Sequence, residues 1–387
     1  MKNNIKSWLP VLSLALAVFI FVTSEFVPVG LLPDISEGVG ETPSKTGLLL
    51  TGYAWVVAVM SLPLTLATGS LDRRKLLLIL MIIFCAGNLT VTLFSSFYPV
   101  LLSRFIVALA HSVFWSIATP LAARLAPNGK TAYGLGIIAA GGALGTVLGV
   151  PLGTFIGQQF TWKTTFIVIS AVSITVFAVL AVILPRLPSI NTGSVKSLPK
   201  LAKNSPLLLS YGITCFLITG HFTLYTYVVP FLAEEVHISA NGIVALLFVF
   251  GFSGTTGIFI VGKFLESCPI KLMMTGISAI ILILAALSII KTSIFLICAA
   301  FITWSIALTI FGISMQNNIL KLAPYAADAA VSIYSGIFNV GIGCGALIGG
   351  MVLKNIGLTF INIIACLIAL PALFLLILQA SMNLSRH

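Results

Sequence analysis

Apolar stretches of about 20 residues recur along the whole chain, separated by short polar gaps. A helix of that length makes all its backbone hydrogen bonds internally, so it can cross the hydrocarbon core of a bilayer. Only 7% of the 387 residues are charged and 59% are hydrophobic, whereas a soluble domain carries roughly 25% charged residues. Because so few charges cannot cover a water-exposed surface, we predict an all-α integral membrane protein.

Twelve transmembrane helices are predicted from the apolar stretches. The first follows Lys2 and Lys6, as a signal peptide would, but its apolar run continues to Leu32 without a small-residue cleavage site. We therefore expect it to be retained as a span. The expected ranges are 8–32, 46–69, 76–95, 98–121, 132–157, 164–185, 206–233, 241–265, 270–290, 293–320, 328–353 and 357–380.

Basic residues are divided unevenly between the two alternating sets of gaps. One set contains most of the Lys and Arg, including Arg73, Arg124 and Arg186, whereas the other contains only Lys45, Lys163, Lys291 and Lys354. By the positive-inside rule, the first set and both termini are expected in the cytoplasm. The net charge of +11 is thereby explained without nucleic-acid binding.

The longest polar stretch, 186–205, is expected to be a cytoplasmic linker between two six-helix bundles, 1–185 and 206–387. Short glycine motifs support duplicated halves: Gly149–Gly153 and Gly341–Gly345 are separated by 192 positions (341 − 149). Duplicated halves with a substrate site near the midplane are a recurrent transporter architecture.

Several classes of protein are disfavoured by missing motifs. The chain has no G-x-x-x-x-G-K-[ST] and no H-E-x-x-H or G-x-S-x-G, so we expect neither an ATP-driven pump nor an enzyme, and no metal or cofactor. No two of the six cysteines have C-x-x-C spacing, so we expect small buried apolar residues at these positions.

Three segments have recognisable patterns: the loop Gly69–Lys75, the fourth-span series of Arg104, Ala108 and His111, and the fifth-span glycine run Gly141–Gly153. They resemble signatures of the major facilitator superfamily (MFS), and the glycine run is typical of its drug:H+ antiporter-1-like branch. Four further blocks look like bacterial sugar efflux transporters of the SotB type: Thr23–Gly30, Tyr53–Ala58, Ala110–Ser116 and Ser335–Gly343.

The resemblance covers nearly the whole chain and implies the MFS fold of twelve helices in two pseudo-symmetric halves. It also implies a monomer that exports arabinose-like sugars or glycosides by alternating access, in exchange for protons. One departure is Phe160–Lys163, which replaces a more usual Gly-Trp-Arg pattern. This departure leaves the substrate open, because related exporters carry sugars, nucleosides or drugs.

Ionisable residues inside a membrane are costly and commonly mark a transport pathway or a proton relay. Glu25 and Arg104 lie at similar depth in spans 1 and 4, which border the central cavity in the family fold. A carboxyl group between burial and a guanidinium can gain and lose a proton, so we expect Glu25, Arg104 and His111 to couple transport to protons. The alternative is a permanent ion pair that only fixes helix packing.

Substrate contacts are expected from polar and aromatic side chains at helical spacing. His111 and Trp115 are four residues apart in span 4 and share one face. An indole can stack on a sugar ring, although a lone membrane histidine is often only an interhelical hydrogen-bonding residue. The expected substrate-binding residues are Tyr53, His111, Trp115, His221, Tyr225, Ser335 and Asn339, with helix packing an equally good interpretation of His221 and Tyr225.

Conformational gating is expected at the second-to-third loop and in span 5. Asp72 and Arg73 are suited to latch the cytoplasmic side, although they also serve to set the topology. Gly145 and Gly149 belong to a series with four-residue spacing that allows close helix packing. With Pro151, the resemblance also implies a part in the rocking of the halves.

We therefore predict a proton-coupled sugar exporter. A drug or nucleoside exporter with the same fold is the nearest alternative, and a membrane receptor that binds without transport is a more distant one.

Overall fold

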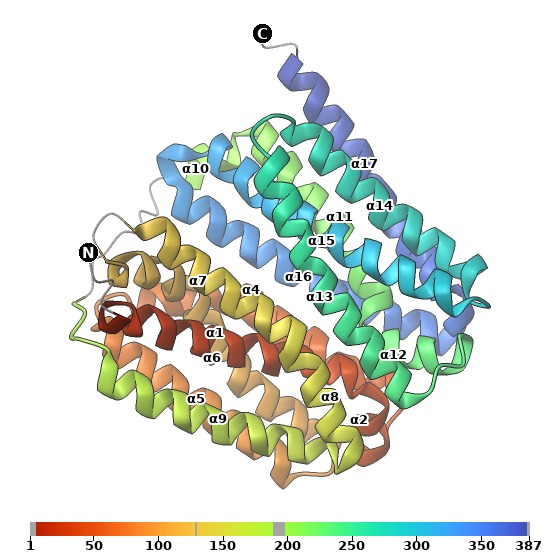
Figure 1. The fold of residues 1–387 in the computed structure, drawn as a ribbon, viewed down its shortest axis with the longest axis horizontal. Helices are drawn as coiled ribbons and strands as arrows, with labels where there is room; N and C mark the ends of the chain where they lie inside the picture. The colour runs from red at the N-terminus through yellow and green to blue at the C-terminus, as the bar shows by residue number, and fades with distance from the viewer. Residues whose placement is uncertain (1–4, 128–129, 189–197, 385–387) are drawn as a thin grey trace. The chain divides into compact units, whose positions relative to one another are not determined.

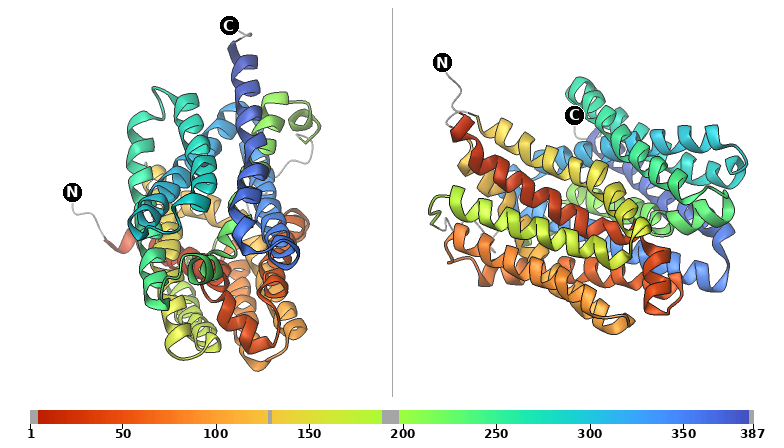
Figure 2. Two further views of the ribbon diagram at one scale, coloured as in Figure 1. Left: turned by 90° about the vertical axis from the view of Figure 1, so that its right-hand side faces the viewer. Right: turned by 60° about the horizontal axis from the view of Figure 1, so that its bottom comes forward.

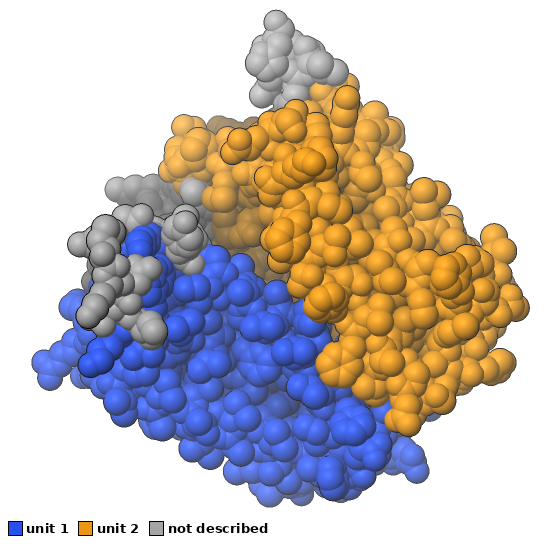
Figure 3. All heavy atoms as spheres, viewed as in Figure 1, with its two compact units in different colours: residues 1–42, 59–192 blue, residues 43–58, 193–387 orange. Residues whose placement is uncertain are grey.

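The computed structural model describes residues 5–127, 130–188 and 198–384, and every regular element in these ranges is helical (Figure 1). The chain divides into two compact units, which Figure 3 colours separately. Unit 1 comprises Met1–Thr42 and Val59–Thr192, and unit 2 comprises Pro43–Ala58 and Gly193–His387. The first part of helix α4 (Leu48–Ala67) thus groups with unit 2, although the sequence analysis placed it in the bundle 1–185.

Unit 1 also contains the short helix η1 (Ile5–Ser7) and a π-helical turn, η2 (Gly145–Gly149). Its α-helices are α1 (Leu9–Gly30), α2 (Leu32–Val39), α5 (Arg73–Leu93), α6 (Phe97–Leu125), α7 (Thr131–Leu144), α8 (Val150–Gln159) and α9 (Trp162–Ile183). Around α1 are packed α6, α7, η2, α8 and α9, and Figures 1 and 2 show α1 alongside α7 and α8.

Unit 2 is built around α11, which packs against α16 and α17, while α15 packs against α13 and α14. Its elements are α3 (Pro43–Thr46), α10 (Leu198–Ala202), α11 (Ser205–Tyr225), α12 (Val228–Pro230), η4 (Phe231–Glu235), α13 (Ala240–Phe264), α14 (Pro269–Ile290), α15 (Ile294–Leu322), η5 (Pro324–Ala326), α16 (Ala327–Asn355), η6 (Leu358–Phe360) and α17 (Ile361–Leu384). The linker predicted at 186–205 includes residues 189–197, which lie outside the described ranges.

Polar residues in the gaps define where several helices begin. At the N-cap of each of five helices, a side-chain oxygen accepts a hydrogen bond from a backbone N–H of the first turn, which otherwise has no partner. These caps are Asp72, Thr161, Asn204, Ser239 and Ser293.

Eleven helices among the described residues are long and apolar enough to cross a membrane. One of them, Gly136–Gln159, combines most of α7 with η2 and α8. The remaining predicted span, 46–69, is the second along the chain and corresponds to α4, a helix of 20 residues that is not among the eleven. The prediction of an all-α membrane fold is confirmed.

The loops that connect the spans contact one another in a pattern that agrees with the alternating sides predicted for them. In unit 1, the Asp72 carboxylate accepts from the backbone N–H of Leu187, and Arg124 donates to the carbonyl oxygen of Pro188. In unit 2, the Glu235 carboxylate pairs with Lys291 at 2.5 Å and accepts from Thr359 at 2.7 Å. Gaps assigned to one side of the membrane therefore meet at one end of their own unit.

The predicted close packing of the fifth-span glycines is confirmed. A methyl group added at Gly141 would lie 2.5 Å from the carbonyl oxygen of Ala15, and one added at Gly145 would lie 2.8 Å from that of Phe19. Both acceptors are on α1, four residues apart, so the backbones of α1 and the fifth span approach closely at these two glycines.

The same packing recurs in unit 2. A methyl group added at Gly345 of α16 would lie 2.6 Å from the carbonyl oxygen of Thr219 on α11. In unit 1, Gly153 faces Val27, and both members of this pair are offset by 192 positions from those in unit 2 (345 − 153 and 219 − 27). The sequence repeat thus corresponds to a repeated helix pair.

Gly141→Ala is expected to lower the stability of the protein by about 1–3 kcal/mol, the usual cost of overpacking a rigid interface. The added methyl group meets backbone atoms of Ala15, which cannot rotate away. Gly136→Ala in the same helix is the matched control, because a methyl group there meets nothing within 4 Å and alanine favours helices. Thermal unfolding in detergent measures both, and equal stability of the two variants would contradict the packing described.

Candidate functional site

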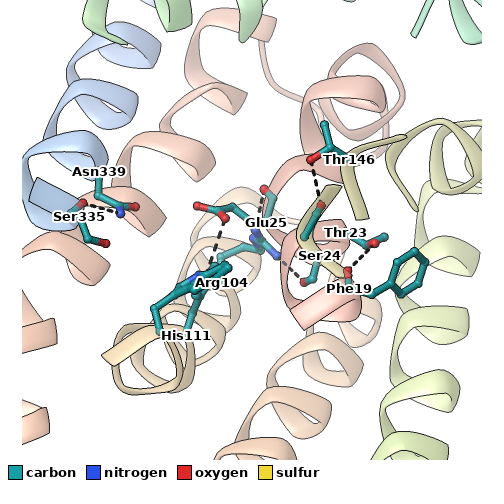
Figure 4. Close-up of polar contacts among 11 residues, drawn as sticks. Phe19, Thr23, Ser24, Glu25, Arg104, His111, Thr146, Ser335 and Asn339 are labelled. Atoms are coloured by element: carbon teal, nitrogen blue, oxygen red, sulfur yellow. Dashed lines mark hydrogen bonds and ion pairs between the residues drawn. The ribbon is translucent and has the colours of Figure 1, made fainter. Parts of the chain in front are cut away.

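Glu25 and Arg104 meet inside unit 1, as the sequence predicted. Glu25 is on α1 and Arg104 on α6, with exposed fractions of 6% and 1%. Arg104 Nη2 donates to the main-chain oxygen of Glu25 at 3.4 Å, and Nη1 donates to Ser24 Oγ at 3.3 Å (Figure 4). The guanidinium therefore binds the backbone and a hydroxyl of α1 next to the acidic side chain.

His111 faces the same carboxyl group from two turns further along α6. Its Nε2 lies 3.8 Å from Glu25 Oε2, and Figure 4 shows the two side chains pointing toward each other. The same Nε2 accepts a hydrogen bond from the indole N–H of Trp115. Because one ring nitrogen cannot accept from Trp115 and carry a proton toward Glu25 at once, Nε2 has two mutually exclusive partners.

Aromatic rings surround this polar cluster. Phe21 on α1 stacks on Phe114 with ring centroids 4.0 Å apart, and lies 4.0 Å from Phe84 and 5.4 Å from His111. The Arg104 guanidinium lies 5.9 Å from the ring centroid of Phe166. Such an apolar shell strengthens electrostatic interactions among the polar groups within it.

Two polar residues of this cluster, Ser24 and Asn88, were missed by the sequence analysis. Both have an exposed fraction of 0%. Ser24 Oγ donates to Asn88 Oδ1 at 2.7 Å, and Asn88 Nδ2 donates to the carbonyl oxygen of Phe84 at 2.9 Å. An asparagine within the apolar span 76–95 was the available signal, because a buried amide needs partners.

In unit 2, His221 and Tyr225 of α11 lie together in an aromatic cluster. Their rings stack with centroids 5.0 Å apart, and Trp304 of α15 meets His221 edge-on at 5.2 Å. His221 Nδ1 and Trp304 Nε1 are buried and have no hydrogen-bond partner within the described parts of the chain. The cluster is completed by Phe222, Phe250 and Phe301. It therefore consists mainly of packed aromatic rings around these two buried nitrogens.

The remaining predicted substrate residues also lie in unit 2. On α16, Asn339 Nδ2 donates to the main-chain oxygen of Ser335 at 3.0 Å, and the buried Asn339 Oδ1 has no partner among the residues that the structure describes. Tyr53, on the part of α4 that belongs to unit 2, is fully buried. Asn339 therefore has a free acceptor, whereas its donor group is occupied by its own helix.

Asp72 and Arg73 hold the end of unit 1 where α5 begins. Asp72 accepts from the backbone N–H groups of Lys75 and Leu187, and the backbone N–H of Arg73 donates to the Leu187 carbonyl at 2.8 Å. Burial raises the pKa of the Asp72 carboxyl, but hydrogen bonds from the backbone N–H groups of Lys75, Leu187 and Arg74 lower the pKa by more than burial raises it. The net shift of the pKa is therefore downward. The carboxylate acts as a helix cap that also fixes the segment after α9.

Gly145, Gly149 and Pro151 occupy an irregular part of their span. Gly145 and Gly149 begin and end the π-helical turn η2, and Pro151 lies in the first turn of α8. Proline has no backbone N–H to donate within a helix, and π-helical turns are frequent at functional sites. The three residues to which the sequence analysis assigned gating therefore lie where the helix is locally widened.

The described residues include no group of three or more His, Cys, Asp or Glu side chains placed to hold a metal ion. All six cysteines are free and half-buried, a more exposed setting than the sequence analysis predicted.

Taken together, the fold and the buried polar cluster are those of a multi-pass membrane transporter with ionisable groups inside its helices. The sequence profile of the Major Facilitator Superfamily matches residues 14–330, and the chain belongs to this family.

Solved structures agree with this fold. A bacterial homologue of the human lysosomal transporter Spinster, inward-facing and unoccupied, is 17% identical with a TM-score of 0.79, covering 100% of this chain and 99% of the other. Its inward-facing, occupied form has 17% identity and a TM-score of 0.74, with 96% of each chain covered. The nucleoside transporter NupG is 16% identical with a TM-score of 0.78, covering 97% of this chain and 100% of the other. At these identities the similarity shows the fold alone.

Proposed function

We propose that this MFS transporter exports sugars from the cytoplasm in exchange for protons, as a monomer in a bacterial inner membrane with both termini in the cytoplasm. The observation that carries the proposal is the position of His111 Nε2, which accepts from Trp115 and lies 3.8 Å from the Glu25 carboxylate. A proton at this nitrogen changes both contacts at once.

Antiport requires the proton and the substrate to compete for the carrier. When His111 is neutral, its Nε2 holds the Trp115 indole in place, and the half-buried ring offers a face for a sugar. When a proton occupies Nε2, the N–H donates a hydrogen bond to the Glu25 carboxylate, and the indole loses its acceptor. Proton binding thus removes the ordered aromatic face, and sugar binding disfavours the proton.

Further substrate contacts are proposed for unit 2. Asn339 Oδ1 is buried and has no partner among the described residues, so it is available to accept from a sugar hydroxyl. Ser335, Tyr53, His221 and Tyr225 are the remaining proposed contacts. They are uncharged hydrogen-bonding or aromatic groups, a composition suited to a neutral polar solute. Asp72, Arg73, Gly145, Gly149 and Pro151 are proposed to gate the conformational change.

Export of nucleosides is the second candidate. A ribose needs the same neutral hydrogen bonds as a sugar, and a base would stack on an aromatic face such as Trp115. The fold is shared with the nucleoside transporter NupG, which adds support of a general kind. Counterflow in proteoliposomes with a panel of radiolabelled sugars, nucleosides and cationic drugs separates these substrate classes, and a receptor that does not transport would show no counterflow.

Glu25→Gln is expected to abolish substrate movement driven by a pH gradient while counterflow of the substrate continues. The glutamine keeps the shape of the side chain but cannot gain or lose a proton, so exchange of substrate for substrate survives and coupling does not. Both rates are measured in proteoliposomes with the substrate found in the panel. Undiminished proton-driven transport by the variant would refute the proposed coupling.

A further inference from the structure

Three buried side chains of unit 1 are linked by hydrogen bonds in the order Asn88 of α5, Ser24 of α1 and Arg104 of α6. Asn88 Nδ2 donates to the carbonyl oxygen of Phe84 in its own helix, so Asn88 Oδ1 faces α1. There it accepts the single proton of the Ser24 hydroxyl at 2.7 Å. The lone pairs of Ser24 Oγ are then directed to Arg104 Nη1 at 3.3 Å. Each bond in this chain has a defined direction, and that direction starts from Asn88.

We propose that Asn88 is a positioning residue for proton coupling, which holds the Arg104 guanidinium against Ser24 and the Glu25 backbone so that the Glu25 carboxyl can change protonation. This inference rests on the proposed function, in which Glu25 and His111 together take up the transported proton. Asn88 itself acts only through Ser24 and Arg104. The amide is 0% exposed within an apolar helix. Without the bond to Ser24, its oxygen would be buried with an uncompensated desolvation cost.

The physical consequence concerns where the positive charge points. Anchored by Ser24 Oγ and by the Glu25 main-chain oxygen, the guanidinium has two of its donors engaged away from the carboxylate. If the Ser24 anchor is lost, the freed donor is expected to turn to the nearest charged acceptor, which is the Glu25 carboxylate. A closer guanidinium stabilises the ionised carboxylate, and a proton then binds only at lower pH.

Few other groups in unit 1 influence this carboxyl. Among the described residues of this unit, Arg104 and His111, both on α6, are the charged or titratable side chains that face Glu25. At this level α7, η2 and α8 bring glycines and Thr154 to α1, while α9 brings Thr165 to Gly153 of α8 and Phe166 to Arg104. More distant charges at helix ends include Lys163, which donates to Ser95 Oγ, and Asp34 and Glu37 in α2.

The test follows the infrared carbonyl band of the protonated Glu25 carboxyl in the purified full-length protein, identified by its absence in Glu25→Gln. Asn88→Ala and Ser24→Ala are each expected to move the titration of this band to lower pH by about 1 unit or more. The double variant is expected to match Ser24→Ala alone, because residues acting through one chain are not additive. Asn88→Asp is expected to move the titration to higher pH, because it adds a like charge.

Ser170→Ala is the matched control. Ser170 is buried and donates to backbone oxygens of Phe166 and Cys85, so it links α9 to α5 without touching Arg104. If Asn88→Ala, Ser24→Ala and Ser170→Ala all titrate like the unmodified protein, the positioning role is refuted. If no band disappears in Glu25→Gln, the carboxyl does not titrate, and the proposed function fails together with this inference.

Discussion

Arg104→Met is expected to abolish proton-driven transport and to lower the stability of the protein by about 3–5 kcal/mol, the cost of removing one partner from a buried charge cluster. Arg104 is 1% exposed, and its loss leaves the Glu25 carboxyl without a nearby guanidinium. The carboxyl would then hold its proton in every state, because an uncompensated buried carboxylate becomes neutral. Transport in proteoliposomes and thermal unfolding in detergent measure the two effects.

Two further variants separate charge from packing at this position. Arg104→Met combined with Glu25→Gln is expected to recover much of the stability but none of the coupling, because glutamine is neutral without having to bind a proton. Arg104→Lys is expected to lose coupling as well, since one ammonium cannot reproduce the two donors that reach Ser24 Oγ and the Glu25 oxygen. Normal transport by Arg104→Met would show that the guanidinium takes no part in the mechanism.

Trp115→Phe is expected to uncouple substrate affinity from pH. Phenylalanine keeps an aromatic face but has no N–H to donate to His111 Nε2, so protonation of His111 no longer releases the ring. In the unmodified protein, substrate affinity is expected to weaken on acidification by roughly 5- to 150-fold, the usual range of coupling between two sites. In the variant the affinity is expected to vary little over the same pH range.

The comparison is made by equilibrium binding of the transported substrate in detergent at several pH values. Trp8→Phe is a suitable control, because Trp8 lies at the N-terminal end of α1, where its ring contacts Lys130. A pH dependence in Trp115→Phe as steep as that of the control would contradict the role given to the indole.

The fold was predictable because membrane helices follow from local composition. Each span needs only a sufficiently long apolar run, and eleven of the twelve expected ranges correspond to candidate spans among the described residues. The close packing of the glycines from Gly141 to Gly153 was also predictable from the local sequence, since a four-residue spacing places them on one helix face. Their packing against α1 confirms that interpretation.

The site was predictable only in part. Glu25, Arg104 and His111 stood out because an ionisable group in an apolar run is costly, and the structure brings all three together in unit 1. The directions of their hydrogen bonds could not be predicted, because these depend on which rotamers neighbouring helices allow. Asn88 was visible as a polar residue in span 3, but nothing in the sequence connects it to Ser24, 64 positions earlier.

The grouping of residues 43–58 with unit 2 was also outside the reach of the sequence. The loop and the start of α4 carry no signal of their tertiary contacts. In the structure, the Ser44 hydroxyl donates to the main-chain oxygen of Gly350, and a methyl group added at Gly343 would overlap the Trp55 ring. Such contacts depend on shape complementarity between segments distant in sequence.

Measuring proton release on substrate binding tests directly whether proton and substrate compete at His111 Nε2. The measurement needs neither a pH gradient nor a membrane. The substrate identified by counterflow is added to purified protein in weakly buffered detergent solution near neutral pH, and a pH indicator records the change. Release of protons by the unmodified protein, with none from Glu25→Gln, is the expected result. Tight substrate binding by the unmodified protein with no proton released at any pH tested would contradict competition between proton and substrate.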